Sequence, residues 1–569
     1  MLAHGSFPVP GREFPGGESR SRRPNRDGLG MPLTAAGWCF FALAWGCAGQ
    51  TSRAAGDMSA LPNVYETNLI KEFRFTGNKV FSSDELGQVV KAYVNRPVTI
   101  LDLEEARVAL TAWYVNRGYV NSGAVMESAQ ATNGVFTYKI VEGRLSILNL
   151  QGNRWLRQSF YQSRLEAGGG DPLNVNEVRN TLQAWRERYP IEQVNADIQP
   201  GALPGEAIMN LKVQEKSPFH LGVQYDNQRP PPTGSGQVDA ILKMDSLTGH
   251  ADPLSLNYGL ARGGDSLTTQ PKFLVADDLS ASYQIPFTAR DTAIGFQYVR
   301  SSASVVEEPF AQLGIESHLE SYGITLSQPL YRTATREFLV SLNGERRAAQ
   351  TYLLGMPYSF SPGAVDGKSV ASVLSAAAQF VDRSLTHVFA ARVTVNACLD
   401  VLDATRNGTD RDGRFVSVIA QTQYLRRLGK SHNELLLRVS GQYTPDPLLS
   451  IEQLPIGGGT TVRGYRENTM VRDKGLLGTA EGHVPLWLGQ EGQSKLQLVP
   501  FADVGAGWNN DSTPVPFDNI GSLGIGFVFE PCRYLSASLF WGHALRQVEY
   551  KTRDLQDDGI HFRLNVWAF

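Results

Sequence analysis

From residue 218 to the C-terminus, segments of roughly ten residues alternate apolar with polar side chains, and turn residues separate the segments. Near the C-terminus, for example, Ile560, Phe562, Leu564 and Val566 alternate with polar residues. Successive side chains point to opposite faces of a strand, so each segment has one apolar and one polar face. A lipid-facing apolar side and a water-facing polar side are typical of a transmembrane β-barrel. Such a sheet must close, because an open edge would leave unpaired backbone groups in hydrocarbon.

The connections between these segments favour a barrel over a soluble β-sandwich, whose strands also alternate. Short turns alternate along the chain with long polar loops, as in outer-membrane barrels. The turns are expected at 286–291, 382–387, 427–433 and 530–533, and the loops near 307–317, 347–368, 403–414 and 544–558. We count about sixteen antiparallel strands in residues 218–569, and an even number places both ends of the barrel on one side. Pro500 interrupts one of these strands, which predicts a bulge or an edge.

Composition excludes several other classes of protein. Charged residues make up 19% of the chain and the formal net charge is -3, whereas a nucleic-acid-binding protein needs a basic face. The body of the chain has no clean apolar run of the ~20 residues that a membrane-spanning helix needs. CxxC, HExxH, GxSxG and nucleotide-binding motifs are missing from the sequence, so we expect no catalytic residue, no metal and no cofactor.

Residues 1–55 have the composition of a secretory signal. Basic residues precede an apolar stretch, Ala35–Ala48, and small residues follow at Ala54 and Ala55. The apolar stretch is too short to span a bilayer, so we interpret it as the core of a signal peptide; a lone membrane anchor is the alternative. A short linker, residues 56–68, is expected before the first folded module.

Residues 69–143 and 144–217 share one order of elements, β-α-α-β-β, repeated at a period of roughly 75 residues. In the first module, Ser82 to Glu85 are cap-like residues in front of a helical pattern. Asn133 and Gly134 form a typical hairpin turn between two predicted strands. We therefore expect two small α+β modules in front of the barrel.

The segments Arg117–Tyr119 (RGY) and Val141–Gly143 (VEG), together with the repeat order, resemble POTRA domains, the periplasmic modules attached to Omp85-type barrels. The resemblance implies that the modules bind unfolded, strand-forming clients along exposed sheet edges, where unpaired backbone groups recruit another chain. The alternative is a pair of generic α/β domains that only space the barrel.

One long loop, residues 444–474, holds the most specific motif of the chain. A glycine run, Gly457–Gly459, precedes Val462–Tyr465 (VRGY), and glycines on both sides let the backbone turn back and present Arg463 at a hairpin-like tip. A phosphate-binding loop is disfavoured because the Lys-Ser/Thr ending of a P-loop is missing. A later strand contains Phe501–Gly505 (FADVG), and alternation places its phenylalanine and aspartate on the lumen side.

The VRGY string and the FxDxG pattern resemble the two-partner-secretion transporters (TpsB) of the Omp85 superfamily, the haemolysin secretion/activation proteins of ShlB/FhaC/HecB type. The resemblance covers nearly all of the chain after the signal. It implies that the loop folds back into the barrel, where Arg463 meets Asp503 on the wall. Since an arginine–carboxylate pair is planar and bidentate, we interpret this pair as a positional latch. The implied site residues are Val462, Arg463, Gly464 and Tyr465 on the loop and Phe501, Asp503 and Gly505 on the wall.

Two further positions bear on the resemblance. Phe569 ends the chain inside the last predicted strand and resembles the recognition signal of outer-membrane barrels. His483 departs from the pattern, because relatives often place arginine there.

The resemblance implies a protein of the outer membrane with its POTRA modules in the periplasm. Its activity would be to translocate, and in some cases activate, a large TpsA-like exoprotein of the haemolysin or filamentous-adhesin type. Outer-membrane lipid and, during biogenesis, the barrel-assembly machinery are the other implied partners; we expect a monomer that binds no nucleic acid. The closest rival is an Omp85-type barrel that assembles or inserts other membrane proteins. Two further alternatives are disfavoured. The POTRA repeats and the VRGY string argue against a passive diffusion porin, and the sequence has no readable set of catalytic residues that would support an outer-membrane enzyme.

Overall fold

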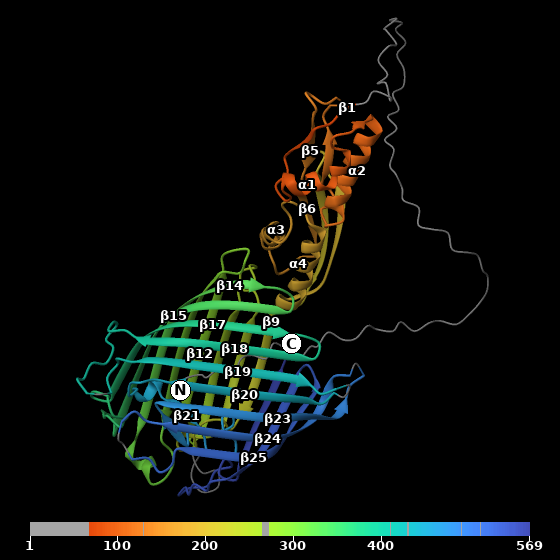
Figure 1. Ribbon diagram of the computed structural model, residues 1–569. Helices are drawn as coiled ribbons and strands as arrows, with labels where there is room; N and C mark the ends of the chain where they lie inside the picture. The colour runs from red at the N-terminus through yellow and green to blue at the C-terminus, as the bar shows by residue number, and fades with distance from the viewer. Residues whose placement is uncertain are drawn as a thin grey trace, which may run out of the picture. The chain divides into compact units, whose positions relative to one another are not determined.

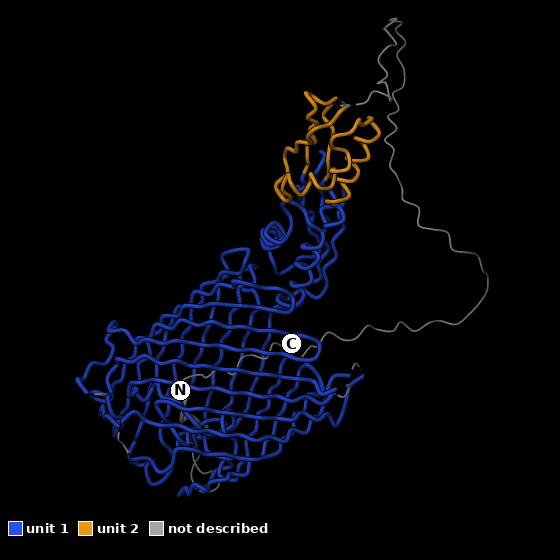
Figure 2. The backbone as a smooth tube through the Cα atoms, viewed as in Figure 1, with its two compact units in different colours: residues 1–12, 115–122, 142–569 blue, residues 13–114, 123–141 orange. Residues whose placement is uncertain are grey.

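The structure is a computed structural model that describes residues 68–568, apart from residues 129, 264–271, 410, 430–431, 491 and 512–513. The expected signal peptide, nearly all of the linker and Phe569 lie outside the described residues. The described chain divides into two compact units (Figure 2). The smaller unit comprises residues 68–114 and 123–141, and the larger one comprises residues 115–122 and 142–568.

The smaller unit is a three-stranded sheet with helices. Its elements are β1 (Asn68–Leu69), β2 (Glu72–Thr76), α1 (Ser83–Val89), η1 (Lys91–Tyr93), β3 (Pro97–Val98), α2 (Ile100–Val115), β4 (Gly123–Met126) and β5 (Val135–Val141). The sheet order is β2-β5-β4, with β2 parallel to β5 and β4 antiparallel to it. Leu86 of α1 and Leu103 and Leu110 of α2 are fully buried in its core.

The turn chemistry of this unit confirms two local predictions. Ser82 caps α1 as a capping box: its hydroxyl accepts from the N–H of Glu85, and its own N–H donates to the Glu85 carboxylate at 2.8 Å. Asn133 and Gly134 both have positive φ, 54° and 81°, as a two-residue hairpin turn of the primed type requires.

The second module repeats the arrangement. Its elements are β6 (Arg144–Gln151), α3 (Gln158–Ala167), α4 (Val175–Arg188), β7 (Ile191–Pro200) and β8 (Glu206–Glu215), with sheet order β6-β8-β7. Phe160, Tyr161 and Trp185 pack in its core. The hydroxyl of Tyr161 donates to the Glu215 carboxylate at 2.6 Å, and burial together with this carboxylate raises the pKa of Tyr161, so the donor stays protonated.

Over the residues that the structure describes, sixteen antiparallel strands then form a closed barrel (Figure 1). They are β9 (Phe219–Asp226), β10 (Gln237–Met244), β11 (Leu254–Gly263), β12 (Lys272–Pro286), β13 (Ala293–Ser304), β14 (Glu316–Arg332), β15 (Arg336–Leu353), β17 (Lys368–Arg383), β18 (His387–Cys398), β19 (Val416–Arg427), β20 (Glu434–Tyr443), β23 (Lys474–Leu488), β24 (Ser494–Trp508), β25 (Asn519–Cys532), β26 (Leu535–Ala544) and β27 (Ile560–Trp567). The short β16 (Met356–Pro357) pairs with the end of β15, and η2 (Pro231–Thr233) and η3 (Phe310–Leu313) lie in connections. Pairing of β27 with β9 closes the ring.

The barrel has two different rims. We call the end at which β9 begins and β27 ends the proximal rim, and the opposite end the distal rim. Short turns lie at the proximal rim, such as residues 384–386 between β17 and β18, and long loops lie at the distal rim, such as residues 545–559 between β26 and β27. The predicted fold, strand count and split of short and long connections are confirmed.

Two sequence-based expectations about the strands are wrong. The loop expected from Arg347 begins later, because β15 continues to Leu353. Arg347 donates from this strand to Glu452 at 2.8 Å, so its polarity marks a lumen-facing strand position rather than a loop. Several strands also exceed ten residues; β15 has 18.

Pro500 marks neither a bulge nor an edge, so that prediction is wrong as well. It lies within β24, opposite Ile525 of β25, and β23 flanks β24 on the other side. The register of β23 and β24 is unchanged across it, with Glu481 opposite Phe501 and Val484 opposite Leu498. A closed ring offers no edge, so the missing N–H interrupts the ladder only locally.

The two faces of the barrel wall differ as the alternation predicts. Leu221, Val223 and Tyr225 of β9 are 44–49% exposed on the outside. Inward-facing positions bury charged groups instead, including Asp226, Glu481 and Asp503. Within the described ranges, no helix is long and apolar enough to cross a membrane.

Candidate functional site in the barrel lumen

The segment between β20 and β23, residues 444–473, folds into the lumen, and we call it the inner loop. It contains the 3₁₀ turn η4 (Ser450–Glu452) and a two-stranded ribbon of β21 (Leu454–Ile456) and β22 (Met470–Arg472), paired antiparallel. Its tip carries the VRGY string, and Val462 is fully buried. Lys474, which the sequence placed in this loop, is the first residue of β23.

Positive backbone dihedrals shape the tip. Gly457, Gly458 and Gly464 have φ of 112°, 106° and 91°, a region that side chains with a Cβ disfavour. The amide of Gly458 donates to the carbonyl of Val462, and the amide of Gly457 donates to the hydroxyl of Thr461. The glycines therefore let the chain reverse tightly enough to present the following arginine to the wall.

Arg463 lies against Asp503 of β24, as the resemblance implied. Its Nε donates to Oδ2 of Asp503 at 2.7 Å and its Nη2 to Oδ1 at 2.8 Å, which is the bidentate geometry. The backbone N–H of Arg463 donates to the same carboxylate at 3.1 Å. The side chain of Asp503 is fully buried and that of Arg463 is 5% exposed.

A second carboxylate, Glu481 of β23, meets the same guanidinium. Nη1 of Arg463 lies 2.9 Å from Oε1 of Glu481, and Arg438 of β20 lies 2.7 Å from that oxygen. His483 contacts Oε2 of Glu481 at 3.1 Å through Nε2, and its Nδ1 lies 2.9 Å from Gln497. The site is thus a network in which two arginines and a histidine surround two wall carboxylates.

Sequence reasoning missed Glu481 as a member of the site. A signal was present, because Glu481 and His483 are two residues apart and so share the lumen face of one strand. His483, noted only as a departure from the relatives, holds Glu481 in place beside Arg463.

Aromatic rings cover the guanidinium of Arg463. The ring centroid of Phe501 lies 3.6 Å from its central carbon, and that of Phe540 in β26 lies 4.8 Å away. The negative faces of aromatic rings attract a cation and exclude water from it. Phe501 of the FxDxG pattern therefore belongs to the site as a stacking partner.

Gly505, the last position of the FxDxG pattern, makes room for the inner loop. A Cβ there would lie 2.6 Å from a methyl of Ile456 and 2.9 Å from a methyl of Val462. Ile456, Val462, Tyr465, Leu477 and Ile520 belong to one buried apolar cluster. On one face of β24, the FxDxG pattern thus places a ring that stacks on Arg463 (Phe501), a carboxylate that binds it (Asp503) and a glycine that leaves space for the inner loop (Gly505).

The remaining VRGY positions contact β25 and β26. A Cβ on Gly464 would lie 2.8 Å from the carbonyl oxygen of Gly542, so the loop and strand backbones touch. The amide of Gly464 donates to Nε2 of His561 at 3.2 Å. The hydroxyl of Tyr465 donates to the carbonyl of Gly521 at 2.9 Å and accepts from the amide of Arg546 at 3.0 Å.

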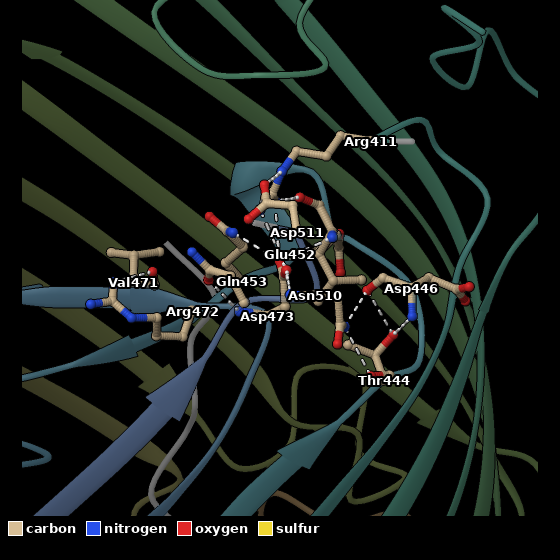
Figure 3. A network of polar contacts seen from close by, with 12 residues as sticks. Arg411, Thr444, Asp446, Glu452, Gln453, Val471, Arg472, Asp473, Asn510 and Asp511 are labelled. Atoms are coloured by element: carbon tan, nitrogen blue, oxygen red, sulfur yellow. Dashed lines mark hydrogen bonds and ion pairs between the residues drawn. The ribbon is translucent and has the colours of Figure 1, made fainter. Parts of the chain in front are cut away.

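The base of the inner loop is held by Asp473, which is fully buried (Figure 3). Its carboxylate accepts from Arg411 at 3.1 Å, from the side chain of Gln453 at 2.9 Å and from the amide of Asn510 at 2.8 Å. Arg411 also pairs with Asp511 at 2.7 Å. Three distal connections, the β18–β19 loop, the inner loop and the β24–β25 loop, therefore meet at the carboxylate of Asp473.

A second arginine of the inner loop, Arg466, faces the distal rim. It pairs with Asp557 at 2.6 Å and with Glu307 at 2.9 Å, residues of the β26–β27 and β13–β14 loops. Its central guanidinium carbon lies 4.0 Å from the ring centroid of Tyr550. Sequence reasoning did not single out these residues.

In the part of the chain that the structure describes, no group of three or more His, Cys, Asp or Glu residues is placed to hold a metal ion. The arrangement is suited to holding a loop in one position by charge, stacking and close backbone contact.

Two protein-family models match this chain, one over most of the barrel and one over the first module. Residues 205–528 match the haemolysin secretion/activation proteins ShlB/FhaC/HecB, and residues 69–143 match the POTRA domain of ShlB type. Among curated proteins, the outer membrane transporter CdiB of Dickeya dadantii is 24% identical over 74% of this chain and 72% of its own length. The hemolysin transporter protein ShlB of Serratia marcescens is 24% identical over 66% of this chain and 64% of its own length.

Solved structures share the fold. CdiB from Escherichia coli matches with a TM-score of 0.66 and 19% identity, covering 91% of this chain and 92% of its own. BamA from Haemophilus ducreyi, lacking POTRA domains 1–3, matches with a TM-score of 0.53 and 12% identity, covering 88% of this chain and 99% of its own.

Proposed function

The chain belongs to the haemolysin secretion/activation family ShlB/FhaC/HecB, and on that premise we propose that it exports one large TpsA-like exoprotein through its barrel. It is an outer-membrane transporter of the two-partner-secretion type, with its POTRA modules in the periplasm. The proximal rim therefore faces the periplasm and the distal rim faces the cell exterior. The exoprotein is of the haemolysin or filamentous-adhesin type, and the transporter acts as a monomer after the barrel-assembly machinery has inserted it.

The sheets of the two modules support a docking step. Each sheet has two outer strands, β2 and β4 in the first module and β6 and β7 in the second. An outer strand offers backbone N–H and C=O groups that an extended client can pair with, whatever its sequence. The client then enters at the proximal rim, and its folding outside the cell draws the rest of the chain forward.

The contact that carries this proposal is the Arg463–Asp503 pair. It fixes the inner loop inside the lumen through which the client must pass, with two hydrogen bonds of 2.7 and 2.8 Å and a third from the backbone. Removing one partner of a buried pair costs about 3–5 kcal/mol, because the other charge stays buried. We propose that Val462, Arg463, Gly464 and Tyr465 form a latch with Phe501, Asp503 and Gly505, and that the latch keeps the loop in the position that export requires.

Two experiments test the proposed function. Deleting the gene should remove one large protein from the medium. If instead many outer-membrane proteins decrease, the rival assembly function holds. Next, Arg463→Ala should reduce export of that protein at least tenfold in barrels that still insert. Arg300→Ala is the matched control, since Arg300 is a barrel-strand arginine whose side chain is 57% exposed. Normal secretion from an inserted Arg463→Ala barrel contradicts the latch.

A further inference from the structure

A groove with a volume of about 560 Å³ lies on the outer surface of the barrel, across β23, β24 and β25 close to the distal rim. Leu476, Val504 and Leu545 form its walls, and they are 59%, 59% and 62% exposed. These residues face outward, where the wall meets lipid. The groove is therefore open to the outer leaflet of the membrane.

Glycines form the floor of the groove. Gly478 of β23 and Gly521 of β25 lie opposite Val504 on either side, so the two wall positions that flank Val504 have no side chain. A Cβ at Gly521 would meet Leu545 at 3.6 Å and Val504 at 3.8 Å, which is ordinary packing distance. The space is thus a recess between side chains that a flexible apolar chain fits.

A positively charged side chain, that of Arg546, lies at the edge of this recess. Arg546 lines the groove, is exposed, and lies with its central guanidinium carbon 5.4 Å from the ring centroid of Phe517. In the described part of the chain it makes no ion pair. An apolar recess beside an arginine at the rim matches a lipid whose headgroup carries phosphate, since arginine binds phosphate oxygens with a planar fork of donors.

The same patch of wall contacts the inner loop from the other side. Gly505 and Ile520, which line the groove, pack inward against Ile456 and Val462. Tyr465 donates to the carbonyl of Gly521, the glycine of the groove floor. The backbone amide of Arg546 donates to the hydroxyl of Tyr465. The groove and the VRGY latch therefore lie back to back across a single sheet layer.

We propose that this groove binds an acyl chain of an outer-leaflet lipid with a phosphorylated headgroup, that Arg546 holds the phosphate, and that occupancy favours the latched position of the inner loop. The acyl chain fills the recess over Gly478 and Gly521. A phosphate on Arg546 steadies the residue that is bonded to Tyr465. The proposal rests on the location in the outer membrane and not on the identity of the exported protein.

Native mass spectrometry of the purified full-length protein in detergent tests the binding, with hexa-acylated diphosphoryl lipid A as the probe. Gly521→Leu fills the groove, and Arg546→Gln removes the charge but keeps the backbone bond to Tyr465. Both variants should bind lipid A at least tenfold more weakly. Gly344→Leu is the matched control for Gly521→Leu, because Gly344 lies opposite the outward-facing Ile324 and a Cβ there meets nothing within 4 Å. Arg553→Gln is the control for charge, because it lies in the same loop and is 83% exposed.

Unchanged binding in both variants overturns the site, and so does an equal loss in the two controls. A non-phosphorylated lipid of equal chain length that binds as tightly as lipid A overturns the role of Arg546. Hydrogen exchange of residues 461–466 tests the link to the latch: lipid A should slow exchange in the natural protein and have no effect in Gly521→Leu. Exchange that does not respond to lipid A in the natural protein overturns the link. Each of these outcomes is independent of a secretion assay.

Discussion

Arg463 and Arg466 are three residues apart on the inner loop, and both are 5% exposed, yet their partners differ. Arg463 pairs with Asp503 and Glu481, which belong to neighbouring strands of the closed ring. Arg466 pairs with Glu307 and Asp557, which belong to loops at the distal rim. The same residue type therefore anchors one side of the loop to two strands of the barrel wall and the other side to two loops of the distal rim.

The ion pairs of Arg463 and Arg466 also differ in how strongly solvent screens them. Asp503 is fully buried and Glu481 is 4% exposed, so water and salt screen their attraction to Arg463 very little. Glu307 and Asp557 are 17% and 16% exposed, so solvent weakens their attraction to Arg466. We infer that the wall pair sets the position of the loop and that the rim pair adds a weaker, salt-sensitive tie.

The largest effect is expected for Arg463→Ala when its stability is compared with that of Arg466→Ala. The first variant leaves two buried carboxylates facing an empty site and should lower the free energy of unfolding by about 3–5 kcal/mol. The second should lower it less, because water still reaches Glu307 and Asp557 once the arginine is gone. Urea unfolding of the refolded barrel in detergent measures both. Equal losses would show that the two arginines are equivalent and would break the comparison.

The next largest effect is the difference in export between variants of the two wall carboxylates, Asp503 and Glu481. Asp503→Asn removes the charge that receives three donors from Arg463, whereas after Glu481→Gln the aspartate still holds the loop. We expect Asp503→Asn to reduce export several times more than Glu481→Gln. A double-mutant cycle with Arg463→Ala should give a coupling of roughly 1–3 kcal/mol for Asp503 and less for Glu481. A larger coupling for Glu481 would reverse the ranking.

Gly464→Ala should have an intermediate effect. It forces a side chain into φ of 91° and places a Cβ 2.8 Å from the carbonyl oxygen of Gly542. Strain in this region costs about 1–3 kcal/mol, so export and unfolding free energy should both fall. Gly408→Ala is a matched control, since Gly408 also has positive φ, 70°, but a Cβ there meets nothing within 4 Å. Equal losses in the two variants would mean that close approach to β26 is unimportant.

The smallest effect is expected for Arg466→Ala on the distal loops. Amide hydrogen exchange should quicken in residues 305–315 and 545–559 and stay unchanged in residues 461–464. Raising the salt concentration should bring the natural protein towards the variant, because partly exposed pairs are screened. If exchange at 461–464 quickens as well, the rim pair and the wall pair act as one unit.

Periodicity in the sequence predicts which face of a strand a side chain takes, and the family resemblance implied the pairing of Arg463 with Asp503; contacts between two loops follow neither. Alternation along β24 places Phe501 and Asp503 on the lumen face, and the structure brings Asp503 to Arg463. Arg466 meets Asp557 across 91 residues, and Arg411 meets Asp473 across 62, each from one loop to another. No periodicity relates two loops, so only the folded chain reveals such pairs.

Two of the errors about strands, those at Arg347 and Pro500, have one physical cause. Arg347 looked like loop sequence because it is polar, and Pro500 looked like an edge because it lacks an N–H. A strand in a closed membrane barrel has a wet inner face that accepts an arginine, and neighbours on both sides that hold it despite one missing bond. The local rules came from open, soluble sheets, whereas the closed ring changes which residues a strand tolerates.

The ring is completed by the pairing of β9 with β27, and the side chain of Asn227 just beyond β9 accepts from the amide of Phe562, 335 residues away. The first and last strands can meet only after every strand between them has been made. Until that moment the growing sheet has two bare margins, each able to join a foreign strand. Closure of this barrel therefore pairs the strands that lie furthest apart in its sequence, and a sheet that is not yet closed needs protection from other chains.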